Sequence, residues 1–133
     1  VLVHRDGPFV TVTLNRPEKR NALALDVMLE LTAVLNDIAA SDATGVILAA
    51  NGPVFSAGHN FGDMAGATID QTRQLFQGCT DMMDTAQAIP QVVIAKVHAL
   101  ATAAGCQLVA TCDLAIAADF LGLKGKCHDR RDQ

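Results

Sequence analysis

The chain has 133 residues, half of them hydrophobic, and a formal net charge of -4 at pH 7. This length allows one domain with a single core, and the acidic balance argues against nucleic-acid binding, which needs a basic surface. No apolar run is long enough to cross a membrane and no basic leader precedes an apolar segment, so we expect a soluble protein with no membrane partner. We place it in the cytoplasm, or in the mitochondrial matrix if a targeting peptide has been removed.

The four cysteines, Cys79, Cys106, Cys112 and Cys127, show neither a CxxC pair nor the spacing of a disulfide framework. Cys106 and Cys112 fall in an apolar segment, where small thiols are common core residues. We therefore predict reduced core cysteines and no metal site.

The hydrophobic pattern alternates between the periods expected of strands and helices. In chain order it predicts a strand pair at 1–6 and 9–14, a helix at 25–40, a strand at 45–50, a helix at 68–89, a strand at 92–97, a helix at 103–111 and a strand at 114–117. Thr68 and Gln71 give the second long helix a capping-box pattern. The alternation favours an α/β fold with a largely parallel sheet, whose ligands bind beyond the carboxyl ends of the strands.

Two corners of small residues follow two of these predicted strands. Ser56-Ala57-Gly58 follows the strand at 45–50, and Ala101 to Gly105, with nothing larger than Thr, follows the strand at 92–97. A ligand or another backbone can approach the main chain closely at such corners. The helix that starts at the second corner also offers free N–H groups and the positive end of its dipole. The alternative is that small residues only let a helix pack closely on the sheet.

Three segments together resemble the signatures of the enoyl-CoA hydratase/isomerase (crotonase) family. They are RPEKRNAL at Arg16–Leu23, FSAGHN at Phe55–Asn60, and AAGCQL at Ala103–Leu108 running on to Cys112-Asp113. The resemblance implies an α/β, crotonase-like (ClpP/crotonase) core, a spiral of β-β-α repeats of which this chain holds the N-terminal part only. Residues 1–119 would form a partial acyl-CoA-binding domain, whereas 120–133 depart from the family and are predicted to be disordered.

The resemblance also implies that two backbone N–H groups, those of His59 and Ala104, bind a thioester oxygen and stabilise an enolate. A general-base role of the His59 imidazole is the alternative at this position. Family hydratases use two glutamates as well. The first position holds Gln107, an amide that cannot accept a proton from water, and the second falls in the unrelated segment 120–133.

The substrate-binding residues implied by the resemblance come from all three segments. Lys19 and Arg20 would face the phosphates of coenzyme A, although a solvated basic pair on a loop is the alternative. Ala22 and Leu23 would offer backbone groups to the adenine and the pantetheine arm. The rest of the predicted set is Ser56, Ala57, Gly58, Asn60, Phe61, Leu100 and Ala103. Coenzyme A enters as part of the substrate, so no separate cofactor is predicted.

The implied function is the binding of acyl-CoA or enoyl-CoA thioesters in fatty-acid metabolism through a two-amide oxyanion hole. Because both catalytic glutamates are missing, we expect hydratase activity to be weak or absent. The rival is a non-catalytic fragment or pseudoenzyme that acts only in CoA binding or oligomerisation. Family members assemble as trimers or hexamers, and we expect this chain to form a homo-oligomer because apolar helix faces and a sheet edge should be uncovered.

Overall fold

The computed structural model describes residues 1–118, whose strands form one sheet in the order β1-β2-β3-β4-β5. The strands are β1 (Leu2–Asp6), β2 (Phe9–Leu14), β3 (Gly45–Ala50), β4 (Val92–Val97) and β5 (Leu114–Ala117). β1 runs antiparallel to β2, and every other neighbouring pair is parallel. The predicted strand pair and largely parallel sheet are therefore confirmed, whereas the predicted disorder at 120–133 lies outside the described residues.

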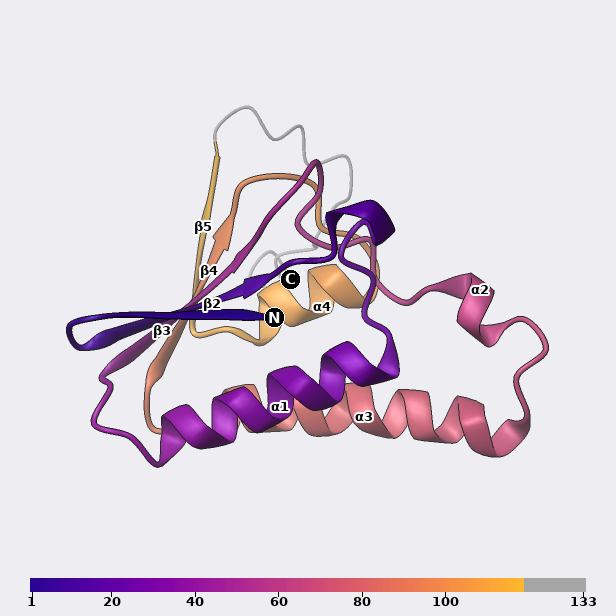
Figure 1. The fold of residues 1–133 in the computed structure, drawn as a ribbon, viewed down its shortest axis with the longest axis horizontal. Coiled ribbons are helices and arrows are strands. Elements are labelled where there is room, and N and C mark those ends of the chain that lie inside the picture. Colours follow the sequence, from indigo (N-terminus) through magenta and orange to yellow (C-terminus); the bar gives the residue numbers. More distant parts are fainter. Residues whose placement is uncertain (119–133) are drawn as a thin grey trace, which may run out of the picture.

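The helices lie mainly on one side of this sheet. They are the 3₁₀ turn η1 (Pro17–Lys19), α1 (Leu25–Ala39), α2 (Phe61–Met64), α3 (Ile69–Ala88) and α4 (Ala104–Thr111). α1 and α3 run side by side, and α4 lies between them and the strands (Figure 1). α3 starts with the predicted capping box, in which the Gln71 amide donates to Thr68 Oγ1 at 3.2 Å and the Thr68 amide donates to Gln71 Oε1 at 2.8 Å.

The core fills the space between sheet and helices with aliphatic side chains and methionine. Val12 of β2, Met28 and Leu31 of α1, Met82 of α3 and Leu108 of α4 have no exposed surface. Each such side chain contributes roughly 1.5–3 kcal/mol relative to an exposed one. The core thus fixes the helices against the sheet and, with them, the loops at the sheet's carboxyl ends.

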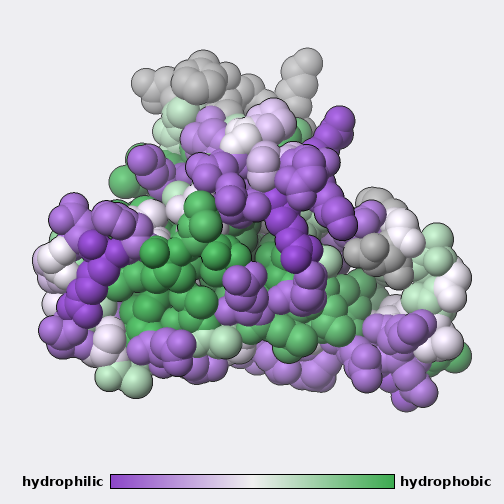
Figure 2. Space-filling model, in the orientation of Figure 1, coloured by the Kyte–Doolittle hydropathy of each residue, from purple (hydrophilic) through white to green (hydrophobic). Residues whose placement is uncertain are grey.

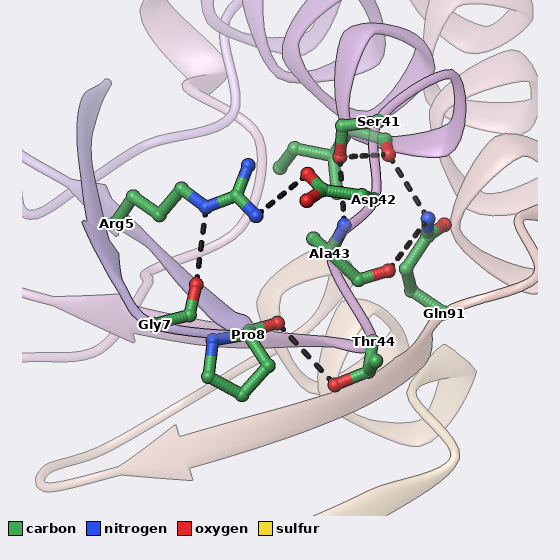
Figure 3. Close-up of polar contacts among 9 residues, drawn as sticks. Arg5, Gly7, Pro8, Ser41, Asp42, Ala43, Thr44 and Gln91 are labelled. Carbon is green, nitrogen blue, oxygen red and sulfur yellow. Dashed lines mark hydrogen bonds and ion pairs between the residues drawn. The ribbon is translucent and has the colours of Figure 1, made fainter.

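Polar contacts tie together the ends at which the parallel strands begin (Figure 3). The buried Gln91 side chain, just before β4, donates from Nε2 to the carbonyl oxygens of Ile38 at 3.0 Å and Ala43 at 3.1 Å. The Thr44 amide, just before β3, donates to the Pro8 carbonyl at 2.8 Å. These contacts lock the hairpin, the end of α1 and the start of β4 into one unit.

Exposed apolar side chains occur on several elements, and two of these areas are large enough to describe. Figure 2 shows an apolar area in the middle of one face, over the N-terminal strand and α1. β5 is exposed along its whole length, with Leu114 58% and Ile116 65% exposed. Unpaired backbone groups on such an edge strand can pair with another chain. Within residues 1–118 no helix has both the length and the apolar character needed to cross a bilayer.

Candidate functional site

Three loops meet where the parallel strands end. They follow β2, β3 and β4 and carry the three segments that the sequence pattern singled out. The Ser56 and Ala101 backbones form a parallel β-bridge between the second and third loops. The Phe55 amide donates to the Leu100 carbonyl at 2.9 Å, and the Thr102 amide donates to the Ser56 carbonyl at 3.0 Å. Main-chain hydrogen bonds thus connect the two small-residue corners.

The side chain of Asn21 joins the first loop to the second. Asn21 is 3% exposed, and its Nδ2 donates to the carbonyl oxygens of Asn51 at 2.7 Å and Val54 at 3.1 Å. Its Oδ1 accepts from the Arg16 amide at 2.8 Å. The residue has φ 48, in the left-handed region that Asn tolerates better than most residues. Asn21 therefore fixes the path of both loops with one fully paired amide.

Ser56 makes the second connection between these loops. Its hydroxyl donates to the Asn21 carbonyl at 2.8 Å and accepts from the Gly58 amide at 3.2 Å. The Leu23 amide donates to the Gly58 carbonyl at 2.8 Å. Ser56 and Leu23 have no exposed surface, so they hold the corner in place, and their predicted substrate-binding role stays a prediction.

The second and third loops approach each other closely at two glycines, where only the small side chains of Ser56 and Ala103 lie near the contact. A Cβ on Gly105 would lie 2.7 Å from the Ser56 carbonyl oxygen, closer than real Cβ atoms approach. Gly58 has φ 81, and a Cβ there would lie 3.0 Å from the Thr102 carbonyl oxygen. Glycine at both positions lets the start of α4 approach the corner after β3 at main-chain contact distance.

The two predicted oxygen-binding amides lie at these neighbouring corners. The Cβ position of Gly58, the residue before His59, is 3.1 Å from the Ala104 nitrogen. Among the described residues neither the His59 N–H nor the Ala104 N–H donates a hydrogen bond, whereas the next amide, that of Gly105, donates to the Thr102 carbonyl at 2.9 Å. Two main-chain donors are thus left available beside each other.

A cleft of about 670 Å³ opens beside these amides. One wall consists of His59, Ala103, Ala104 and Gln107, and the other of Met64, Phe76, Cys79, Thr80 and Met83 from α2 and α3. Its volume and apolar wall suit a small, partly hydrophobic ligand. Among the described residues no carboxylate lines the cleft, and the exposed Gln107 side chain occupies the position at which the family resemblance places a glutamate.

The His59 ring is held from two sides. Its Nδ1 lies 3.0 Å from the Leu23 carbonyl oxygen. The ring also meets Phe76 edge-on, with centroids 5.7 Å apart and planes at 88°, an arrangement that aromatic pairs favour. The predicted oxygen-binding role of His59 uses only its main-chain N–H. Its half-buried ring is held in a defined position by separate contacts.

The wall from α3 was not predicted from the sequence. The sequence predicted Cys79 as a core residue, and both Cys79 and Met82 on this helix are buried. Phe76, Thr80 and Met83 follow the same spacing on an adjacent stripe of the helix and face the cleft. A second stripe of side chains beside the core stripe of α3 was therefore the sequence signal from which this cleft wall could have been predicted.

The remaining predicted CoA-binding residues belong to the loops and to the start of α2. Lys19 and Arg20 are exposed at η1, and Leu100 is 45% exposed. Ala57 donates its amide to the Arg20 carbonyl at 3.0 Å, and Ala22 donates to the Lys19 carbonyl at 3.1 Å. Asn60 is half-buried, and Phe61 is the first residue of α2. Contact of these groups with coenzyme A stays a prediction.

Cys79, Cys106 and Cys112 form no disulfide within the described residues, and burial disfavours the ionised form of Cys79 and Cys112. Burial raises the pKa of the Cys79 thiol, and burial together with the charge of Asp113 raises the pKa of Cys112 to about 11. A protonated thiol is a poor nucleophile, so Cys79 is not a thiolate in the cleft. The core prediction is confirmed for Cys79, but Cys106 and Cys112 are only half-buried. Among residues 1–118 no three His, Cys, Asp or Glu side chains form a metal-binding group.

Ala103 carries backbone strain at the entrance of α4. It has φ 48 and ψ -125, a region that glycine reaches freely and that costs other residues about 1–3 kcal/mol. This conformation turns the chain from β4 into the helix, which is why α4 begins at Ala104 and not at the predicted residue 103.

Ala103→Gly should therefore stabilise the protein by about 1 kcal/mol, because relief of strain exceeds the roughly 0.5–1 kcal/mol entropic cost of glycine. Urea unfolding midpoints measure the change. Ala110→Gly, on the exposed side of α4, is the matched control and should destabilise by about 1 kcal/mol. Equal losses in both variants would contradict the strain at residue 103.

Comparison with known proteins gives one consistent result. The family model described as enoyl-CoA hydratase/isomerase matches residues 5–120. The enoyl-CoA hydratase domain-containing protein 3, mitochondrial, of Danio rerio is 41% identical over 120 residues, covering 89% of this chain and 42% of that protein. The 2,3-dehydroadipyl-CoA hydratase of Escherichia coli is 31% identical over 124 residues, covering 90% of this chain and 46% of that protein.

Similar solved structures belong to the same family. An enoyl-CoA hydratase from Mycobacterium smegmatis superposes with a TM-score of 0.84 at 45% identity, covering 87% of this chain and 46% of that one. This chain thus spans less than half the length of these relatives. The predicted crotonase-like α/β fold, in its N-terminal part only, is confirmed. The chain belongs to the enoyl-CoA hydratase/isomerase family.

Proposed function

We propose that this chain binds acyl-CoA or enoyl-CoA thioesters and holds the thioester oxygen between the main-chain amides of His59 and Ala104. The observation that carries this proposal is the pair of unpaired N–H groups at adjacent corners beside the 670 Å³ cleft. The name of the Escherichia coli relative, a hydratase of a CoA thioester, supports the ligand class. We place this binding in fatty-acid metabolism, with hydratase activity weak or absent.

The chemistry of the site agrees with this ligand. Donors that are fixed before charge develops on the oxygen need no reorganisation, and main-chain donors need no side-chain ordering. The acyl chain would lie against Met64, Phe76 and Met83, and the exposed Lys19 and Arg20 would meet the phosphates of coenzyme A. The Danio rerio relative is named as mitochondrial, which supports the mitochondrial matrix over the cytoplasm for this chain.

Calorimetric titration of the full chain with a short saturated acyl-CoA tests the proposed oxygen site. His59→Ala keeps the amide and should change Kd by no more than about threefold. Ala104→Val puts a branched side chain into the corner beside both donors and should weaken binding about thirtyfold or more, roughly 2 kcal/mol. His59→Pro deletes one donor and should weaken binding comparably.

Ala110→Val, on the exposed face of the same helix, controls for the loss of helix propensity and should bind normally. If His59→Ala abolishes binding while Ala104→Val does not, the ligand depends on the imidazole and the two-amide site is wrong.

The second candidate is a non-catalytic protein that acts by CoA binding or self-association. The exposed β5 strand and the apolar area of Figure 2 favour it, because such surfaces promote contact between chains. We propose a homo-oligomer on the same grounds. Sedimentation velocity over a range of concentrations is the test, and a compact monomer throughout would count against association.

A further inference from the structure

The hydrogen bond of the His59 ring determines which of its nitrogens carries the proton. The Leu23 carbonyl oxygen, 3.0 Å from Nδ1, can only accept a hydrogen bond, so Nδ1 must be the donor. In the neutral ring Nε2 then has a free lone pair. No described group pairs with Nε2, and this atom is not sealed from solvent.

The surroundings of the His59 ring place Nε2 near the position that a bound thioester would occupy. His59 lines the same cleft as Ala104 and Gln107, and the edge-on contact with Phe76 restricts rotation of the ring. The oxygen-binding amide and the imidazole belong to one residue, so covalent geometry keeps the base within a side-chain length of a thioester oxygen held at that amide. The carbon next to the thioester carbonyl is two bonds from that oxygen.

We propose that His59 is a catalytic general base that removes a proton from the carbon next to the thioester carbonyl. This inference rests on the proposed binding function and adds an activity to it. Nε2 takes the proton, the C–H bonding pair forms the carbon–carbon double bond of the enolate, and the carbonyl pair moves onto the oxygen held by the two amides. The imidazolium then exchanges its proton with solvent and returns one to the same carbon, so the cycle needs no second reactant.

Enolisation suits this cleft better than hydration does. It needs one base and stabilisation of one oxyanion, which His59 and the two amides provide together. Hydration needs groups that both activate water and deliver a proton, and Gln107 can only orient a water molecule. Loss of one general base typically lowers a rate about 10²–10⁴-fold.

The test is exchange of α-hydrogen for deuterium in butyryl-CoA dissolved in D₂O with the full chain, followed by NMR and mass spectrometry. The wild type should exchange about a hundredfold or more faster than His59→Ala. His59→Asn should be equally slow, because its side-chain amide can still donate to the Leu23 carbonyl but cannot accept a proton. His4→Ala removes an exposed imidazole on β1 and should exchange at the wild-type rate.

Titration of each variant with the same butyryl-CoA separates the proposed thioester binding from the proposed general-base role of His59. Binding without α-exchange by the wild type, or wild-type exchange by His59→Asn, overturns the general-base role and leaves the binding site standing. Absence of binding by the wild type overturns both.

Discussion

Hydration of a short enoyl-CoA by this chain should be about a thousandfold or more slower than the 10–10³ per second of ordinary enzymes. The reason is that, among the described residues, no carboxylate lines the cleft to transfer protons. The chain has two glutamates, Glu18 and Glu30; Glu18 lies in η1, and Glu30 pairs with the N-terminal amine at 2.7 Å. Neither lines the cleft, where Gln107 supplies only an amide.

Loss of the conjugated thioester absorbance measures this rate directly. Gln107→Glu places one carboxylate in the cleft and should recover part of the activity, but not a full rate, because hydration needs groups that both activate water and deliver a proton. Turnover by the wild type within tenfold of about 10 per second would falsify the assignment of Gln107 as the cause. As a control for substrate quality, an authentic hydratase should be assayed in the same experiment.

Asn21→Ala should destabilise the protein by about 3–5 kcal/mol. Three hydrogen bonds to a buried side chain disappear at roughly 0.5–1.5 kcal/mol each, and the groups of Arg16, Asn51 and Val54 that it satisfied lose their partner. Alanine must also adopt the φ of 48, which costs about 1–2 kcal/mol. This sum is a large part of the 5–15 kcal/mol typical of a whole domain.

Chemical unfolding followed by circular dichroism is the measurement. Asn51→Ala is the matched control, because the Asn51 side chain is exposed and donates only to Asn15 Oδ1 at 3.0 Å; it should cost less than about 0.5 kcal/mol. Asn21→Asp should also be strongly destabilising, because it turns a carboxylate oxygen toward two carbonyl oxygens. A loss below about 1 kcal/mol for Asn21→Ala would show that the loops hold together without this side chain.

The elements were predictable because their signals are local. The apolar run 45–50 and the capping box at Thr68 each depend on neighbours in sequence, and β3 and α3 appear where these signals place them. The three site loops were also recognisable. How they touch was not, because it depends on Asn21 reaching a loop about thirty residues away and on Ala103 adopting a strained conformation. Neither property follows from hydrophobic periodicity.

The end of the sheet at which the parallel strands begin, opposite the cleft, is suitable for attaching the protein to a solid surface. The turn at Gly7 has free space, with nothing within 4 Å of a Cβ placed there, and it joins β1 to β2 at the end where the parallel strands begin. The cleft opens at the other end. An introduced cysteine at Gly7 is unsuitable because of the φ of 57. An introduced cysteine at the neighbouring exposed Asp6 would anchor the molecule to a sensor chip with the end that carries the cleft facing solution.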